Sequence, residues 1–149
     1  MPLRELKYPH QVENWLADWG GKLQKPGSMI LIGSGALLWH AHQAGMNSPL
    51  PENSMDVDPV TEDDEVAMLA YEALIGSAFE KTNGWHVNLM PRAVLDEFPD
   101  DWLRRARTKG YGNLTVTVPS AGDLLIPKLK RGEPRDKLHE QWARQLNLV

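Results

Sequence analysis

Cysteine is absent from this chain of 149 residues. Its absence excludes disulfide bonds, thiolate zinc sites and a cysteine nucleophile. Long apolar runs are missing too: no stretch approaches the roughly 18 apolar residues of a membrane helix, and the charged residues at positions 1–7 leave no apolar segment for a signal peptide. We therefore expect a soluble, cytoplasmic protein that makes no membrane contact.

Internal repeats and low-complexity linkers are also absent. A chain of this length has the size of one domain, and it buries about two thirds of its unfolded surface on folding. We predict a single domain over residues 1–149.

Basic residues are scarce in the first two thirds of the chain. Residues 1–100 contain 6 Lys and Arg against 15 Asp and Glu, and residues 101–149 contain 10 against 5, so a segment of charge −9 precedes one of +5. A basic segment beside an acidic body is typical of proteins that contact phosphates or nucleic acids, and equally of proteins whose opposite charges pair internally. The charge distribution leaves both explanations open.

The hydrophobic pattern predicts alternating helices and strands. It indicates helices at 9–23, 36–44, 66–79, 98–107, 120–129 and after Pro134, and strands at 29–32, 55–60, 85–90 and 113–118. The acidic run at 62–65 suits the first turn of a helix better than a metal site. This order predicts a mixed α/β domain in which helices flank a small sheet.

A glycine-rich turn, Gly33-Ser34-Gly35, joins the strand at 29–32 to the next helix. The first turn of a helix presents unpaired backbone N–H groups and the positive end of the helix dipole, which together bind phosphate. Glycine lets the backbone approach closely, and Ser34 adds a hydroxyl donor. The spacing matches neither a Walker A loop nor a dinucleotide-binding fingerprint. Phosphate binding at Gly33 and Ser34 is one interpretation, and a plain structural turn is the other.

Asp56 and Asp58 lie two residues apart on the strand predicted at 55–60. Side chains alternate along a strand, so both carboxylates project to one face and Val57 to the other. Adjacent carboxylates repel each other unless a cation lies between them, and Mg²⁺ prefers oxygen ligands. The pair predicts a magnesium site, with Mn²⁺ as the alternative ion. Solvated charges on an edge strand would give the same pattern.

The two motifs together resemble those of nucleotidyltransferases. Gly-Ser-x-Ala-Leu at 33–37, followed by a loop and Ser-Met-Asp-Val-Asp at 54–58, is similar to the nucleotidyltransferase superfamily, in particular to its minimal and AbiEii-type toxin–antitoxin branches. The segment 118–136, with its Val-Pro-Ser, Asp-Leu, Lys-Leu and Arg-Asp pairs, resembles a further element of that branch. The resemblance covers residues 28–146 and leaves residues 1–27 as an N-terminal helical addition.

The resemblance implies roles for individual residues. Asp56 and Asp58 would be the catalytic metal ligands, and Gly33 and Ser34 would hold the phosphates of a nucleoside triphosphate. The second half of the nucleotide site would consist of Lys128, Arg135 and Asp136. Lysine is a point charge for phosphate and arginine a forked donor, although a solvated basic helix face contains the same residue types.

This chain departs from the family pattern in two places. The arginine that precedes the aspartates in the family is absent, and Ser54 replaces a threonine. The strand at 85–90 contains no acidic residue where catalytic members commonly supply a third carboxylate, and its polar face offers His86 and Asn88 instead. We expect His86 to be the third metal ligand.

These motifs predict a protein that binds a nucleoside triphosphate with magnesium and transfers a nucleoside monophosphate to a hydroxyl of RNA or protein. Positioning and metal electrostatics would supply most of the catalysis. The departures favour a second hypothesis, a catalytically degenerate member that acts as a binding module for a cognate toxin or antitoxin. A third is simple RNA binding through the basic C-terminal third. The sequence leaves open whether the protein is an enzyme.

Overall fold

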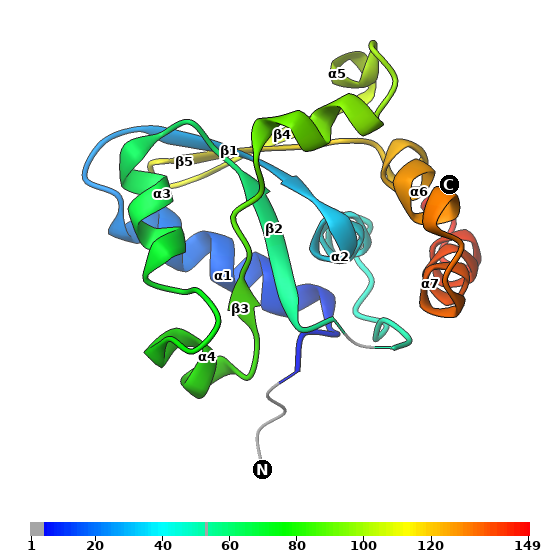
Figure 1. The fold of residues 1–149 in the computed structure, drawn as a ribbon, viewed down its shortest axis with the longest axis horizontal. Helices are drawn as coiled ribbons and strands as arrows, with labels where there is room; N and C mark the ends of the chain where they lie inside the picture. Colours follow the sequence, from blue (N-terminus) through cyan, green and yellow to red (C-terminus); the bar gives the residue numbers. More distant parts are fainter. Residues whose placement is uncertain (1–4, 53) are drawn as a thin grey trace.

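A computed structural model describes residues 5–52 and 54–149 (Figure 1). Residues 1–4, which belong to the predicted domain and its N-terminal addition, lie outside the described residues. The same is true of Asn53, in the loop that precedes the two aspartates.

The centre of the fold is a mixed sheet with the strand order β3-β2-β1-β5-β4. The middle strand, β1 (Gly27–Ile32), runs antiparallel to β2 (Asp56–Val60) and parallel to β5 (Leu114–Val118). At the edges, β3 (His86–Val87) runs parallel to β2, and β4 (Arg107–Tyr111) runs antiparallel to β5. The predicted mixed α/β fold with a small sheet is confirmed.

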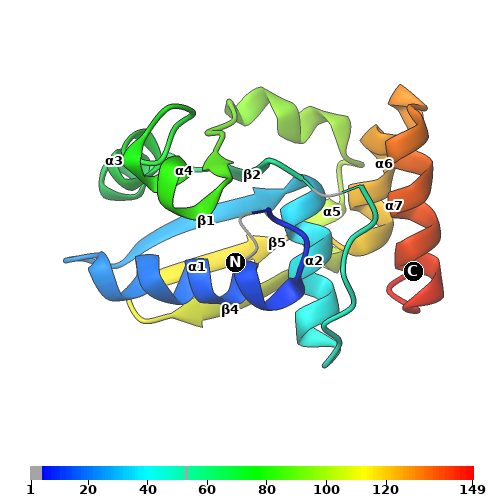
Figure 2. The ribbon, with the colours of Figure 1, turned by 90° about the horizontal axis from the view of Figure 1, so that it is seen from below.

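Two helices cover one face of the sheet. Helix α1 (Pro9–Lys22) packs on α2 (Gly33–Gln43) and on β4 and β5. Figure 2 shows α1 along this face and the segment with the 3₁₀ helix η1 (Arg92–Glu97) on the other side. Pro9 suits the first helical position, and a stripe at helical spacing is buried against the sheet: Val12, Trp15, Leu16 and Trp19.

The last two helices, α6 (Ala121–Arg131) and α7 (Pro134–Gln145), lie side by side at one end of the molecule (Figures 1 and 2). The side chain of Ser120 caps α6 by accepting the backbone N–H of Asp123 at 3.1 Å. The helix ends at Gly132, whose φ is +66°. Contacts between α6 and α2 bring the C-terminal segment to the start of α2.

Two of the predicted helices are wrong in detail. The single helix expected at 66–79 is two helices, α3 (Asp64–Tyr71) and α4 (Ala78–Asn83), because Gly76 has a φ of +84° and Ser77 caps the second helix. The helix expected at 98–107 is only α5 (Trp102–Arg105), and the chain then forms β4, a strand that the pattern did not predict. Within residues 5–52 and 54–149, no helix is both long and apolar enough to cross a membrane.

Candidate functional site

Strand β2 places the two aspartates on the same face of the sheet. Asp58 lies opposite Ile32, the last residue of β1, and Asp56 lies opposite His86 of β3. Val57 points to the other face, where its side chain is fully buried and lies close to Gly35. This alternation holds both carboxylates beside the turn from β1 to α2.

Gly33 begins α2 with a φ of +76°. A Cβ atom at this position would overlap Asp58 Oδ2, so only glycine leaves room for the carboxylate against the start of the helix. On the opposite side, the Asn88 side-chain amide donates a hydrogen bond to Asp58 Oδ1 at 3.2 Å. The Asp58 carboxylate is thus enclosed between a helix start and a neutral amide.

Enclosure changes the proton affinity of Asp58. Burial, followed by the charge of Asp56, raises the pKa of Asp58 to about 7, and the hydrogen bond from Asn88 only partly offsets this. At neutral pH the pair therefore holds its full negative charge only when a cation compensates it.

Lys128 reaches the same place from α6. Its side chain is almost completely buried, and Nζ donates a hydrogen bond to Ser34 Oγ at 3.0 Å. Burial lowers the pKa of Lys128 to about 8, although the nearby Asp136 carboxylate acts in the opposite direction. Such an amine gains a strong interaction when an anion comes close to it.

Asp136 lies behind Lys128 and has no solvent exposure. Its Oδ1 atom accepts a hydrogen bond from Arg131 at 2.8 Å and lies 3.7 Å from Lys128 Nζ. Burial raises the pKa of Asp136, but the hydrogen bond from Arg131 and the charges of Arg131 and Lys128 outweigh it, so the pKa stays below its usual range. Asp136 Oδ2 has no hydrogen-bond partner within the described residues.

Apart from Asp136, these side chains line one cavity of about 330 Å³. Its polar lining residues are Ser34, Ser54, Asp56, Asp58, Asn88, Glu97, Lys128, Arg131 and Arg135. Its apolar lining residues include Met55, Met90, Val94 and Phe98. Of the residues predicted for the site, all but Asp136 and His86 line this cavity: Gly33, Ser34, Asp56, Asp58, Lys128 and Arg135.

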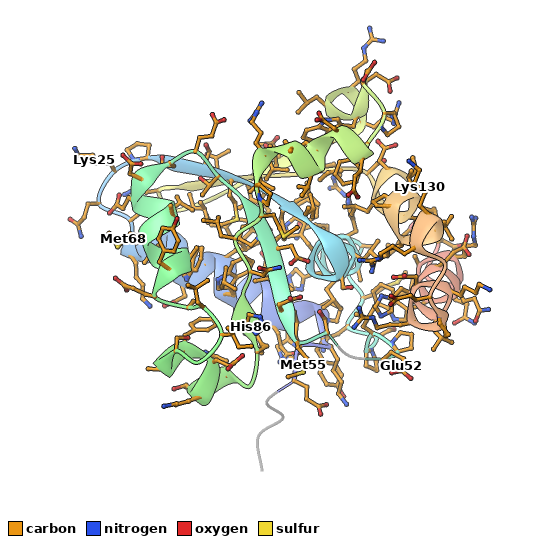
Figure 3. The ribbon with its side chains drawn as sticks, viewed as in Figure 1. Lys25, Glu52, Met55, Met68, His86 and Lys130 are labelled. Carbon is orange, nitrogen blue, oxygen red and sulfur yellow. The ribbon has the colours of Figure 1, made fainter. Side chains whose placement is uncertain are left out.

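His86 lies beside the aspartates but outside the cavity. Its Nε2 atom is 3.8 Å from Asp56 Oδ2, and its Nδ1 atom is 2.8 Å from Glu80 Oε2, where the two groups are not aligned for a hydrogen bond. Figure 3 shows His86 near Met55, at the end of the sheet where β2 begins. Asn88, rather than His86, contacts Asp58. Across the described residues, no three His, Asp or Glu side chains form a group that could hold a metal ion.

His139 is a site residue that the sequence reasoning missed. It is completely buried, and its Nδ1 atom lies 3.1 Å from Lys128 Nζ and 3.4 Å from Ser34 Oγ. The signal available in the sequence is its position three residues after Asp136, which places both side chains on the buried face of α7.

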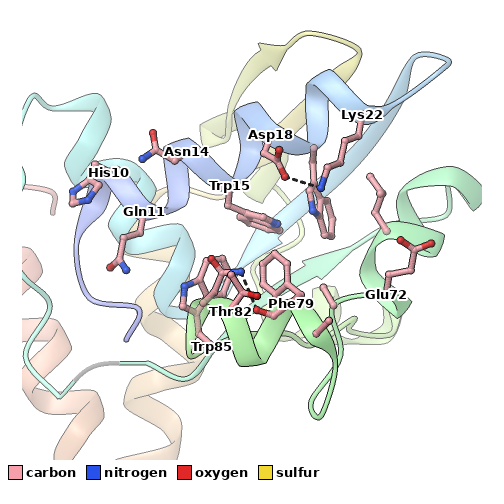
Figure 4. A pocket seen from close by; sticks show the side chains of 15 residues that line it. His10, Gln11, Asn14, Trp15, Asp18, Lys22, Glu72, Phe79, Thr82 and Trp85 are labelled. Carbon is pink, nitrogen blue, oxygen red and sulfur yellow. Dashed lines mark hydrogen bonds and ion pairs between the residues drawn. The ribbon is translucent and has the colours of Figure 1, made fainter. Parts of the chain in front are cut away.

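A larger cavity lies elsewhere. It measures about 720 Å³ and lies between α1 and α4, with Trp15, Trp19, Phe79 and Trp85 among its lining residues (Figure 4). None of the predicted site residues lines it. Size alone would therefore select a region without the carboxylates and the buried lysine, so we place the candidate site at the smaller cavity.

In this mixed α/β domain, paired aspartates on a strand face a Gly-Ser helix start. The family described as "Nucleotidyltransferase of unknown function (DUF6036)" matches residues 13–145, and the chain belongs to this family. No curated protein and no solved structure gives a significant match.

Proposed function

We propose that the protein binds a nucleoside triphosphate in the 330 Å³ cavity and transfers the nucleoside monophosphate to a hydroxyl of RNA or protein. The observation that supports this most directly is the convergence of Asp56, Asp58, the start of α2 and Lys128 on one cavity. The positively charged lining residues suit phosphates, and the apolar lining residues suit a nucleobase.

The donor set fits a magnesium ion, because the charge of two adjacent carboxylates, one of them the buried Asp58 with its raised pKa, is compensated by a divalent cation with oxygen preference. Asp56 and Asp58 would hold it. Bound there, the ion would neutralise charge on the transferred phosphoryl group. His86 remains a predicted ligand, and its contacts with Glu80 and Asp56 would have to rearrange for it to reach the ion.

The residues of the chain itself orient the triphosphate. Ser34 and the first N–H groups of α2 donate to phosphate oxygens, while Lys128 and Arg135 supply positive charge from the facing side. In the reaction, the acceptor oxygen forms a bond to the α-phosphorus, the bond to pyrophosphate breaks, and the acceptor proton passes to solvent. Catalysis then consists mainly of positioning and electrostatic stabilisation.

A thermal shift experiment tests nucleotide binding. Each of the four ribonucleoside triphosphates, added with Mg²⁺, should be compared with buffer for the wild type and for Asp56→Asn plus Asp58→Asn. We expect at least one nucleotide to raise the Tm of the wild type and to lose this effect in the double variant. The matched control is Asp18→Asn plus Asp64→Asn, which removes two exposed carboxylates. An equal shift in wild type and double variant would exclude the site.

The position of the third metal-binding carboxylate favours a second function. Asn88, a neutral side chain, contacts Asp58 where catalytic members commonly supply a carboxylate. A catalytically degenerate protein would bind nucleotide without transferring it. Incubation with α-³²P-labelled nucleoside triphosphates, RNA and cell extract separates the two functions, because only the enzyme transfers label to a macromolecule.

We also propose that the chain belongs to the AbiEii-type toxin–antitoxin branch, on the basis of the Lys128 and Arg135-Asp136 element. The partner would be a cognate toxin or antitoxin encoded by a neighbouring gene. Coexpression with that gene product tests this, and the expected result is a stable complex or relief of growth inhibition. Absence of both would remove the support for this branch.

A further inference from the structure

The imidazole of His139 joins three separate segments of the chain. Its Nδ1 atom faces Lys128 of α6 and Ser34 of α2. Its Nε2 atom lies 2.9 Å from the carbonyl oxygen of Pro51 and 3.1 Å from that of Glu52, in the loop before β2. The residue is completely buried, so these contacts account for both of its polar atoms.

The partners determine the tautomer. Carbonyl oxygens only accept hydrogen bonds, so Nε2 must bear the proton. A lysine ammonium group only donates, so Nδ1 must be the unprotonated acceptor. A neutral imidazole with its proton on Nε2 satisfies both sides, and an imidazolium would lose the contact with Lys128.

The surrounding charges favour the same neutral form. Burial, followed by the charges of Lys128 and Arg135, lowers the pKa of His139, and the two carbonyl contacts only partly oppose this. The Asp136 carboxylate lies on the same helix as His139. It forms ion pairs with Arg131 and Lys128, which compensate its negative charge. Glu52 faces the ring through its backbone carbonyl.

The loop contacts also lead toward the aspartates. Glu52 has a φ of +50°, a left-handed conformation that is unfavourable for a non-glycine residue and needs support from its surroundings. Two residues further on, the Ser54 hydroxyl donates to the backbone carbonyl of Asp56 at 3.0 Å. The loop that His139 contacts therefore runs directly into the strand that holds the carboxylates.

We propose that His139 is a positioning residue of the phosphate site. In its neutral Nε2–H form its Nδ1 holds the Lys128 amine, and through Lys128 the Ser34 hydroxyl, toward the cavity, while its Nε2–H holds the loop before β2. This inference rests on the proposed nucleotide site for its functional meaning. The arrangement of the ring itself can be tested without any nucleotide.

The first test is ¹⁵N NMR of the imidazole groups in the wild type. We expect His139 to show a protonated Nε2 and an unprotonated Nδ1, and to be mostly neutral at pH 6.5, where an unperturbed imidazole is half protonated. A proton on Nδ1, or an imidazolium at pH 7, would overturn the proposal.

The second test separates the two ring contacts. His139→Gln places an amide donor near the Nε2 position and removes the acceptor for Lys128, whereas His139→Asn places an acceptor near Nδ1 and removes the donor to the loop. The readout is the pH-dependent acylation rate of the Lys128 amine, followed by mass spectrometry. We expect a several-fold faster reaction in His139→Gln and a rate near wild type in His139→Asn. Equal rates in both variants would mean that the ring acts only by filling space.

The matched control is His40→Gln. His40 is also buried and its Nε2 atom contacts a backbone carbonyl, that of Pro119, at 2.7 Å, but it lies outside the cavity. This variant should leave Lys128 acylation unchanged.

Binding of inorganic triphosphate with Mg²⁺ then tests whether the contacts of His139 matter for the proposed function. We expect His139→Gln to weaken its binding by about tenfold, the effect of one charge-assisted contact, and His139→Asn to weaken it less. If the wild type does not bind triphosphate, the proposed function fails while the acylation result still decides the role of His139. If it binds and both variants bind as tightly, the positioning role fails alone.

Discussion

At the residue scale, Gly33 serves both the fold and the candidate site. Its φ of +76° lets the chain turn from β1 into α2, and its missing side chain leaves space for Asp58 Oδ2. Gly45 has nearly the same backbone conformation, with a φ of +77°, but a Cβ there would meet no atom within 4 Å. A comparison of the two glycines therefore separates the cost of a left-handed backbone from the cost of a steric overlap with Asp58.

We predict that Gly33→Ala destabilises the protein more than Gly45→Ala. Both substitutions impose a left-handed conformation on alanine, which costs about 1–2 kcal/mol, and only Gly33→Ala also displaces the Asp58 carboxylate. Urea denaturation measures the free energies of unfolding. Gly33→Ala should additionally abolish the Mg²⁺-nucleotide Tm shift, and Gly45→Ala should retain it. Equal effects of the two substitutions would contradict the assigned close approach.

At the scale of elements, one hydrogen-bonded group ties α1, α2 and β4 together. The Trp39 indole N–H donates to the Tyr111 hydroxyl at 2.8 Å, and this hydroxyl donates to Glu13 Oε2 at 2.7 Å. Trp39 and Tyr111 are both buried. Lys109 also binds Glu13, at 2.7 Å, so the edge strand β4 is fixed to α1 by two contacts.

Tyr111→Phe tests this connection. The substitution leaves the Trp39 N–H buried without an acceptor, so we predict a loss of about 1–3 kcal/mol in the free energy of unfolding. Exposed Tyr71→Phe is the control and should change stability by less than about 0.5 kcal/mol. Binding of the nucleotide with Mg²⁺ should be unaffected at saturation, since the group lies outside the cavity. A Tyr111→Phe protein as stable as wild type would show that the indole finds another partner.

The same scale explains which elements the sequence could predict. Helices α1, α6 and α7 have local start signals, namely Pro9, Ser120 and Pro134, so their first residues could be predicted closely. Strand β4 reads Arg-Thr-Lys-Gly-Tyr and has one buried residue, Tyr111. It is a strand because β5 pairs with it, and no local pattern reports such pairing.

Prediction of the candidate site had a similar limit. Residues next to a backbone motif, Ser34, Asp56 and Asp58, could be found from spacing alone. The position of His86 outside the cavity depends on the register of a two-residue strand. The role of His139 depends on contacts across more than 80 residues of sequence, which only the packing of α7 against the loop before β2 creates.

At the scale of the whole molecule, internal pairing accounts for part of the basic C-terminal third. Arg105 binds Asp101 and Asp123, Lys109 binds Glu13 of the acidic body, and Arg131 binds the buried Asp136. Lys128, Arg135 and also Arg131 line the cavity. This division favours a local phosphate site over a continuous basic surface, so any RNA affinity should come mainly from the cavity. RNA binding that is unchanged in Lys128→Met plus Arg135→Met would contradict this expectation.

The cavity also makes global stability depend on pH. A carboxyl group with a pKa of about 7 in the folded protein and about 3.8 in the unfolded chain binds its proton more tightly when folded. The free energy of unfolding therefore falls as the pH rises from about 4 to about 7, and the penalty from Asp58 is complete above pH 7. Lys128 has the opposite effect, because its pKa of about 8 in the folded protein lies below that in the unfolded chain. Its contribution makes the free energy of unfolding rise with pH, and only above about pH 8.

We accordingly predict that Asp58→Asn stabilises the nucleotide-free protein at pH 8 and has little effect at pH 4.5. Because Asp58 is partly exposed, the gain should be on the order of 1–2 kcal/mol. Urea denaturation at a series of pH values between 4.5 and 8 measures the free energy of unfolding of wild type and of Asp58→Asn. Taking the difference between the two proteins cancels the contributions of His40 and His139, which are common to both. Asp56→Asn should give a smaller change of the same sign, because the charge of Asp56 is only the second cause of the raised pKa. Parallel stability curves for wild type and Asp58→Asn would show that Asp58 is ionised at neutral pH without a cation, and would remove the electrostatic argument for one.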